Sequence, residues 1–184
     1  MRPQKLTQTE MLQRCAMVFK QHGYYATSME MLAQACGLTK AAFYYHYKNK
    51  EALLLDIVKF IRQYAFVKIF SLCNQVHDAV QCYQQLHQTA SQFFSQGICG
   101  CFMAIIALDV KDQLPEVMAE IQQFFRDWQV AMQHLYLCKY DAIDAYLYAK
   151  EAIADYEGAI LMTRITGDEF YLAQVQKRIL MRLA

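Results

Sequence analysis

Apolar side chains recur along the chain with the spacing of α-helices. Near the N-terminus, Leu12, Cys15, Ala16 and Phe19 stand at i, i+3, i+4 and i+7, so they share one face of a helix expected between about residues 7 and 22. Similar patterns predict body helices near 50–72, 77–96, 101–111, 115–138, 141–165 and 168–183. Only two prolines and six glycines interrupt the 184 residues. We therefore expect an all-α protein of about nine helices.

The segment from 27 to 47 predicts two short helices joined by a tight turn. Thr27 and Glu30 have the spacing of a capping box, which marks a helix start. Gly37 ends that helix, because glycine readily adopts the positive φ of a tight turn. Thr39 is a suitable N-cap for the next helix, which is expected to run to about residue 47. Two such helices around a glycine turn are typical of a helix-turn-helix.

The second of these short helices is expected to have two different sides. At about 100° per residue, Phe43 and Tyr47 share one side and should pack inward, while Ala41, Ala42 and Tyr45 point the other way. The surrounding stretch, GLTKAAFYYHYKNK, mixes aromatic rings with cations. A buried core accommodates the rings but not the cations, so we expect an exposed binding surface here.

The charge of the chain is distributed unevenly. Residues 1–50 carry seven Lys and Arg against two Asp and Glu, a balance of +5, whereas the remaining residues carry eleven against fifteen, a balance of −4. A basic N-terminal part on an acidic body indicates that the N-terminal part meets a polyanion.

Composition and motifs exclude several classes of protein. No apolar run approaches the roughly 20 residues of a membrane span, and the start MRPQKLTQTE is polar, so we expect a cytoplasmic protein. Seven cysteines at irregular spacing do not predict a disulfide framework. The chain has no glycine-rich phosphate loop, nucleophile elbow or metal-binding helix motif. We therefore expect no enzyme, no cofactor and no metal site.

The segment TSMEMLAQACGLTKAAFYYHYKNKEALL, residues 27–54, resembles the DNA-binding signature of the TetR family of bacterial transcriptional regulators. The resemblance implies a helix-turn-helix DNA-binding domain over 1–48 and a helical ligand-binding and dimerisation domain over 49–184. It further implies a homodimer that binds a palindromic double-stranded DNA operator, with no membrane partner. A small apolar or electrophilic effector would release this regulator, which we expect to be a repressor.

The resemblance also implies which residues contact DNA. The expected set combines the start of the first short helix, the second short helix and the cations after it: Thr27, Thr39, Lys40, Ala41, Ala42, Tyr44, Tyr45, His46, Lys48 and Lys50. Position 41 is often Gly in the family and position 42 often Ser or Thr. Alanine at both leaves a methyl group that can meet a thymine but removes a polar contact.

The body is expected to form the dimer interface and the ligand pocket. In the family the last two long helices form a bundle across the two-fold axis, which here implies Tyr156, Gly158, Ala159, Ile160, Met162, Ile165, Leu172, Val175 and Ile179. Candidate pocket residues are aromatic or sulfur-containing: Tyr64, Phe93, Phe94, Cys101, Met103, Phe124, Trp128 and Tyr148. For both sets, ordinary core packing is the alternative interpretation.

The stretch GICGCFMAIIALD, from Gly97 to Asp109, resembles a branch of the family that contains thiol-based sensors of electrophiles and oxidants. A helix start at Cys101 favours a reactive thiolate, and Cys99 is placed to resolve a sulfenic acid. Buried structural cysteine is the alternative reading. Besides the ligand-released repressor, we therefore keep open a thiol-redox or metal-responsive repressor, and a constitutive DNA-binding scaffold without a ligand.

Overall fold

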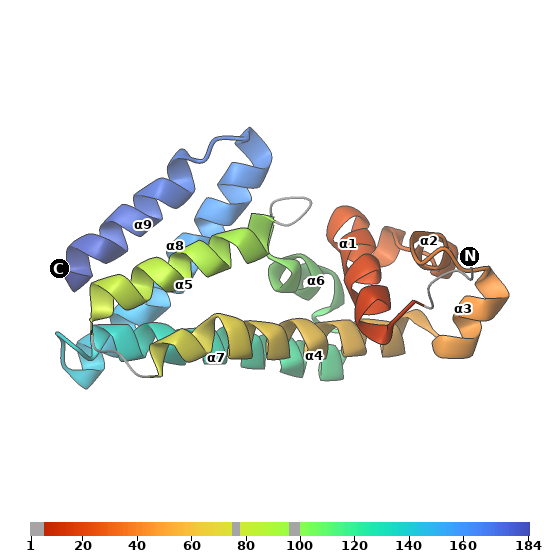
Figure 1. Ribbon diagram of the computed structural model, residues 1–184, viewed down its shortest axis with the longest axis horizontal. Coiled ribbons are helices and arrows are strands. Elements are labelled where there is room, and N and C mark those ends of the chain that lie inside the picture. The colour runs from red at the N-terminus through yellow and green to blue at the C-terminus, as the bar shows by residue number, and fades with distance from the viewer. Residues whose placement is uncertain (1–5, 75–77, 96–99) are drawn as a thin grey trace. The chain divides into compact units, whose positions relative to one another are not determined.

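The computed structural model describes residues 6–74, 78–95 and 100–184, without the side chains of Phe94 and Ser95. Over these residues the chain is all-α, as the sequence predicts (Figure 1). The α-helices are α1 (Gln8–Ala26), α2 (Met29–Ala35), α3 (Lys40–His46), α4 (Lys50–Lys68), α5 (Ala79–Ser95), α6 (Phe102–Val110), α7 (Pro115–Tyr136), α8 (Ala142–Thr166) and α9 (Phe170–Leu183). In the described residues, no helix has the length and apolar character needed to cross a membrane.

The helices divide into two compact units. Unit 1 comprises Met1–Arg62 with Phe102–Ile121, and unit 2 comprises Gln63–Cys101 with Gln122–Ala184. Both α4 and α7 contribute residues to each unit. The domain boundary expected after residue 48 remains a prediction. In the packing of the structure, α6 and the first part of α4 belong to the same unit as the N-terminal helices.

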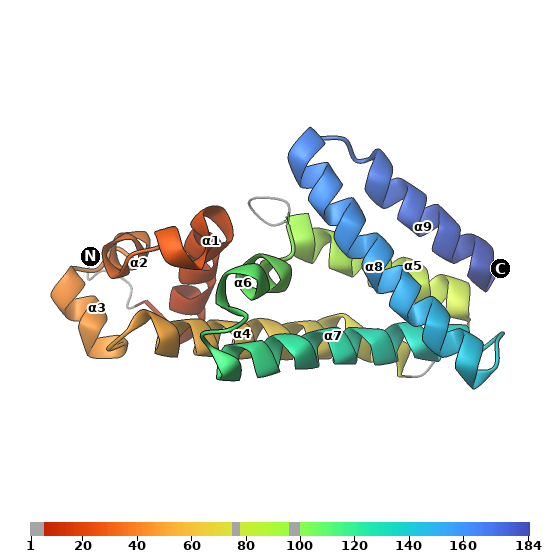
Figure 2. The ribbon, with the colours of Figure 1, turned by 180° about the vertical axis from the view of Figure 1, so that it is seen from behind.

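Unit 1 is built on α1, which packs against α2 and, as Figures 1 and 2 show, lies beside α6. Thr7 and Glu10 form a capping box at the start of α1, since the Thr7 hydroxyl accepts from Glu10 N and the Glu10 carboxylate accepts from Thr7 N. Gly23 interrupts the helix with a φ of 74°. The Tyr24 N–H after this kink donates to Asp109 Oδ2 of α6 over 2.6 Å.

Two expected helix boundaries are wrong. The sequence predicted a capping box between Thr27 and Glu30, but Ser28 caps α2, and its hydroxyl accepts from Met31 N over 3.2 Å. Thr27 is buried because its hydroxyl donates to Gly23 O over 2.6 Å. The helix expected over 50–72 ends at Lys68, and a separate 3-10 turn, η1 (Phe70–Cys73), follows it.

Unit 2 has its core between α5, α7, α8 and α9. Trp128, Phe124 and Tyr83 are almost completely buried in it, and large aromatic side chains supply much of the burial that stabilises a helical body. Helices α8 and α9 lie side by side in both ribbon views (Figures 1 and 2). Asp141 caps α8 and Gly167 ends it with a φ of 75°, so the two helices are separated by a short turn.

Candidate nucleic-acid interface

Local capping defines the two short helices of the helix-turn-helix. Ser28 begins α2, and Thr39 begins α3 by accepting from Ala42 N over 3.2 Å. Between them Gly37 has a φ of 68°, a conformation that side chains rarely allow. The Leu38 N–H returns to Ala33 O over 2.9 Å. These bonds fix how α3 follows α2, as the sequence predicted from Gly37 and Thr39.

The inward side of α3 anchors it to unit 1. Phe43 is completely buried and Tyr47, at the end of the helix, is nearly so. The Tyr47 hydroxyl donates to Asp56 Oδ2 of α4 over 2.9 Å. Burial, and then this hydrogen bond, raise the pKa of Tyr47 to about 12, so the phenol remains a donor at neutral pH. The predicted inward pair is confirmed.

The outward side of α3 is open to solvent. Of the ten predicted DNA contacts, the exposed ones are Thr39, Lys40, Ala41, Ala42, Tyr44, Tyr45, His46 and Lys48. Tyr45 is 91% exposed, which is rare for so large a ring without a partner to meet. Its ring touches that of His46 edge-on at 6.1 Å. The helix thus presents two small methyl groups between a cation and two phenols.

Thr27 and Lys50, the other two predicted contacts, are placed differently. Thr27 is 2% exposed, so its side chain faces unit 1 and not the solvent. Lys50 is partly buried, and its Nζ donates to Tyr24 O over 2.7 Å and to Thr27 O over 2.9 Å. Its pKa is lowered, mainly by burial. An ammonium group has three N–H donors, and these two hydrogen bonds use two of them.

Tyr24 is a positioning residue that the sequence did not reveal. The ammonium of Lys50 lies 4.1 Å from the centre of its ring, and its hydroxyl donates to Glu51 Oε1 over 2.6 Å. This hydrogen bond is the main cause of the lowered pKa of Glu51. Residues 24 and 50–51 thereby join the kinked end of α1 to the start of α4. Ser28 and Tyr25, both exposed, are further surface residues missed by the prediction.

The predicted ligand residues fall into separate groups. Phe124 and Trp128 are buried together in unit 2, with ring centres 6.2 Å apart. Tyr64 stacks on Phe93 at 5.6 Å. Tyr148 instead packs against Tyr136 and Tyr140, and Met103 is buried in unit 1. The side chain of Phe94 and all of Cys99 lie outside the described structure. A single pocket of all the predicted residues therefore remains a prediction.

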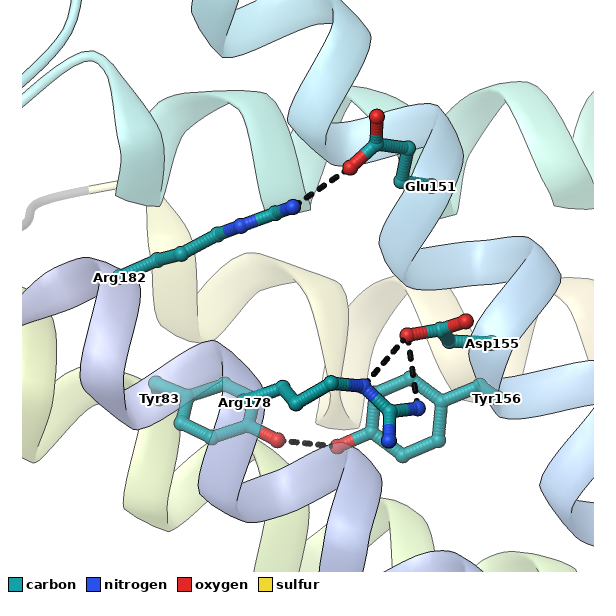
Figure 3. Close-up of polar contacts among 6 residues, drawn as sticks. All are labelled: Tyr83, Glu151, Asp155, Tyr156, Arg178 and Arg182. Carbon is teal, nitrogen blue, oxygen red and sulfur yellow. Dashed lines mark hydrogen bonds and ion pairs between the residues drawn. The ribbon is translucent and has the colours of Figure 1, made fainter.

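A hydrogen-bonded chain of side chains crosses the core of unit 2. The hydroxyl of Tyr156 contacts the hydroxyl of Tyr83 at 2.6 Å, as Figure 3 shows, and Nδ1 of His87 at 2.7 Å. Burial lowers the pKa of His87, so its ring is neutral at pH 7, and burial raises the pKa values of both tyrosines. Sequence reasoning missed Tyr83 and His87, although their i, i+4 spacing places them on one face of α5.

The sequence predicted that Cys101 begins a helix, but α6 begins one residue later, at Phe102. The side chain of Cys101 is 3% exposed. Its thiol donates to the carboxyl group of Glu157, whose Oε1 atom is buried without a hydrogen-bond partner. Burial raises the pKa of Glu157 to about 7, an effect that the bond from Cys101 partly offsets. A carboxylate beside a thiol opposes formation of the thiolate, which weakens the case for a reactive Cys101.

The predicted dimer residues are divided between surface and core. Gly158 and Ile165 are exposed, and Met162 and Leu172 are half-buried. Ala159, Met162 and Val175 line a groove of about 480 Å³ between α8 and α9. Tyr156, Ile160, Val175 and Ile179 are buried within the protomer, so they contribute to its core, and their part in a dimer interface stays a prediction. Leu161 and Phe170, more than half exposed, were missed.

Two ion pairs hold α9 to α8 beside this groove (Figure 3). Arg178 donates through Nε and Nη2 to Asp155 Oδ2 over 3.0 and 2.8 Å, and Arg182 Nη1 lies 2.7 Å from Glu151 Oε2. All four side chains are substantially exposed, so each pair contributes little to stability alone.

An exposed, cationic second helix in a helix-turn-helix, followed by a large helical body, defines a helix-turn-helix transcription regulator. Comparison with known families agrees. Residues 12–57 match the family described as bacterial regulatory proteins of the tetR family, and residues 76–178 match the C-terminal domain of LmrA/YxaF-like transcriptional regulators. The chain belongs to the TetR family of transcriptional regulators, with an LmrA/YxaF-like C-terminal domain.

Curated relatives match the N-terminal part. The chain is 36% identical over 55 residues to YuxN, an uncharacterised HTH-type regulator of Bacillus subtilis, and 44% identical over 43 residues to YerO of the same organism. These matches cover 30% and 23% of this chain but only 19% and 15% of the two relatives. They support the helix-turn-helix and leave the body without a close curated counterpart among them.

Solved structures match the whole fold. A TetR regulator from Legionella pneumophila superposes with a TM-score of 0.85 at 21% identity, covering 97% of each chain. One from Agrobacterium tumefaciens gives 0.80 at 20% identity over 94% of each chain. The reduced form of E. coli NemR gives 0.77 at 16% identity over 92% of each. At these identities the likeness concerns the fold alone.

Proposed function

We propose that this protein is a ligand-responsive repressor that binds a palindromic DNA operator as a homodimer in the cytoplasm. Helix α3 enters the major groove, and a small apolar or electrophilic effector held in unit 2 releases the DNA. The observation that carries this proposal is the two-sided α3. Phe43 is buried in the core, while Lys40 and Tyr44 on the flanks of the helix and Tyr45 on its outward side are exposed.

The roles of these exposed residues follow from their chemistry. Lys40, Lys48 and the phenol of Tyr44 are suited to phosphate oxygens, and such contacts position a protein without specifying sequence. Ala41 and Ala42 offer methyl groups that fit the C5-methyl of thymine. The very exposed Tyr45 is the side chain best placed to reach base edges or the flanking backbone.

A gel-shift titration on a duplex selected from random DNA by the reduced protein tests the DNA-binding proposal. We expect Lys40→Ala to weaken binding about tenfold and to reduce the dependence of affinity on salt by roughly one phosphate contact. Lys59→Ala is the matched control, because Lys59 is an exposed lysine of unit 1 outside the proposed interface. Failure to select any palindrome at low salt, or equal loss in both variants, would contradict the proposal.

The homodimer is supported by the exposed face of α8 and α9. Leu161 and Ile165 stand on this face with Phe170, and each is more than half exposed. A patch of large apolar residues on a long helix pair is characteristic of an interaction surface. Gly158 has no neighbouring atom within 4 Å of where a Cβ would stand, which leaves room for the close approach of a partner helix.

The effector is proposed to bind in unit 2, where the aromatic core contains the polar groups of Tyr83, His87 and Tyr156. Thermal unfolding with a panel of flat apolar and electrophilic compounds tests this, because a ligand that binds only the folded state raises the melting temperature. Stabilisation together with release of the duplex supports an effector. A panel that never stabilises the protein favours the constitutive scaffold.

A further inference from the structure

Two cysteines meet in the core of the helix-turn-helix. Cys15 of α1 and Cys36, the residue that caps the end of α2, bring their Sγ atoms to 3.5 Å. Cys15 is completely buried and Cys36 is 4% exposed. Both belong to unit 1, so their contact depends on how α1 packs on α2.

The two thiols are electrostatically unequal. A hydrogen bond from Cys15 lowers the pKa of the Cys36 thiol, and Arg14 nearby adds to the effect. The same contact, together with burial, raises the pKa of Cys15. A thiolate that accepts from a neighbouring thiol is the usual arrangement of a reactive dithiol. Cys36, which is also the more exposed of the two, is therefore the nucleophile and Cys15 its partner.

We propose that Cys15 and Cys36 form an oxidation site, at which a hydroperoxide converts the dithiol to a disulfide between α1 and α2 and thereby weakens DNA binding. The second half of this statement rests on the proposed function, whereas disulfide formation does not. The oxidant must be small, because little of either sulfur reaches the surface.

The chemistry balances in two steps. The Cys36 thiolate attacks the distal oxygen of the hydroperoxide, the O–O bond breaks, and the alkoxide or hydroxide that leaves takes up a proton, which gives a sulfenic acid. Cys15 then loses its proton and attacks the sulfenic sulfur, so that the S–S bond forms and water leaves. Overall, two thiols and one hydroperoxide yield one disulfide, one alcohol or water molecule, and one water.

A disulfide changes the geometry of the DNA-reading helices. Its sulfurs stand about 2.05 Å apart, whereas the two thiols are 3.5 Å apart. Close packing around Leu12, Leu32 and Phe43 leaves little room to absorb this contraction. Since α2 packs on both α1 and α3, movement of the end of α2 is passed to the turn at Gly37 and to α3.

A second pair of cysteines is a natural control. In unit 2, Cys73 of η1 and Cys82 of α5 have Sγ atoms 3.9 Å apart. The Cys82 thiol also donates to Leu72 O over 3.0 Å. Mainly because of burial, the pKa values of both thiols are raised. Cys82 is more exposed than Cys15 or Cys36, so this pair tests whether proximity and access alone are enough. Because neither of its thiols has a lowered pKa, we expect it to oxidise more slowly.

Mass spectrometry after treatment of the full-length protein with hydrogen peroxide tests the disulfide. Trypsin should place the two cysteines in separate peptides, 15–20 and 21–40, each with one cysteine. We expect these peptides to become linked before any Cys73–Cys82 bond forms, and to separate on reduction. The link should be absent from Cys15→Ala and Cys36→Ala, whose folding is checked by circular dichroism. If wild-type protein stays unlinked, or if Cys73 and Cys82 pair first, the proposal is wrong.

Gel shifts with reduced and oxidised protein on the selected duplex test the effect on DNA. We expect oxidation to weaken wild-type binding at least about tenfold, with recovery on reduction, and to leave Cys15→Ala unaffected while Cys73→Ala behaves as wild type. If the disulfide-linked and the reduced protein bind the duplex with equal affinity, the proposed effect on DNA binding is wrong, although the disulfide itself is established. If reduced protein binds no duplex, the proposed function and the regulatory half fail together, and the linked peptides still decide the disulfide.

Discussion

At the scale of single residues, the buried polar groups of unit 2 have the largest expected effects on stability. Glu157 has a carboxyl group that burial keeps partly protonated near neutral pH. Tyr156 holds two hydrogen-bond partners inside the aromatic core. In both cases a polar group is buried away from water. Substitution therefore changes the free energy of unfolding by the cost of a buried charge or of a buried group that has lost its hydrogen-bond partner.

Glu157 should make stability fall as pH rises. Its folded pKa of about 7 lies above the ordinary value of 4.5 for a glutamate carboxyl, so between these pH values the folded state binds the extra proton and loses stability as pH rises. Above pH 7 the buried carboxylate is charged and the loss is complete. Glu157→Gln should remove this dependence and be more stable than wild type at pH 8 by up to about 3 kcal/mol. Urea unfolding at pH 5 and pH 8 measures the free energy of unfolding of both proteins. If this free energy changes by the same amount between the two pH values in wild type and in Glu157→Gln, the prediction is wrong.

Tyr156→Phe should destabilise the fold by about 1–3 kcal/mol, because it leaves the Tyr83 hydroxyl and His87 Nδ1 without their shared partner. Tyr83→Phe is the matched variant, since it removes one hydroxyl but leaves the bond between Tyr156 and His87. Chemical denaturation should show the larger loss for Tyr156→Phe. Equal losses would mean that the network is not organised around Tyr156.

At the scale of elements, the kink in α1 and the turn after α2 show how backbone conformation positions neighbouring helices of unit 1. Gly23 and Gly37 both adopt positive φ. They differ in surroundings: a Cβ at Gly23 would stand 2.7 Å from Asp109 Oδ2, whereas nothing lies within 4 Å at Gly37. The first glycine is required by a contact with α6 as well as by its φ, and the second by its φ alone.

Gly23→Ala should therefore be the more harmful of two otherwise similar changes. Both substitutions incur the strain of positive φ, about 1 kcal/mol each. Gly23→Ala also displaces the Asp109 carboxylate that accepts from Tyr24 N, and should lose at least about 1 kcal/mol more. Thermal melts of both variants provide the comparison. A Gly37→Ala protein as unstable as Gly23→Ala would show that strain alone matters.

At the scale of the whole molecule, the exposed apolar face of α8 and α9 is the main feature that a lone protomer leaves unexplained. Ile165 is 68% exposed and Leu161 is 56% exposed. In contrast, Ile160, on the other side of the same helix, is buried in the protomer core. Substitutions on the exposed side of α8 should therefore affect association, whereas substitutions on its buried side should affect the stability of the protomer.

Ile165→Lys should shift the protein from dimer to monomer without lowering the helix content of the protomer, because this side chain makes few contacts within it. Ile160→Ala should instead lower the melting temperature through a core cavity. Sedimentation velocity and circular dichroism separate the two outcomes. A wild-type protein that remains monomeric at micromolar concentration, or an Ile165→Lys dimer, would contradict the assigned face.

Many boundaries of the fold could be predicted from local signals. Thr39 and Gly37 begin or end helices as expected. Asn49 gives a similar local signal at the start of α4, where its side-chain Oδ1 accepts from Ala52 N over 2.8 Å. The wrong boundary at Thr27 shows the limit of such signals. Thr27 and Ser28 are both good caps, and the choice fell to Ser28 because Thr27 is drawn inward to the Gly23 carbonyl.

The sequence by itself determined the helical elements, the helix-turn-helix and the outward set on α3, because these follow from side-chain spacing within a few turns. Only the tertiary structure decided the partners of the buried groups. Cys15 and Cys36 are 21 residues apart, and Tyr83 and Tyr156 are 73 apart. Contacts at such separations depend on how the helices pack, and helical periodicity assigns a residue to a face without naming what that face will meet.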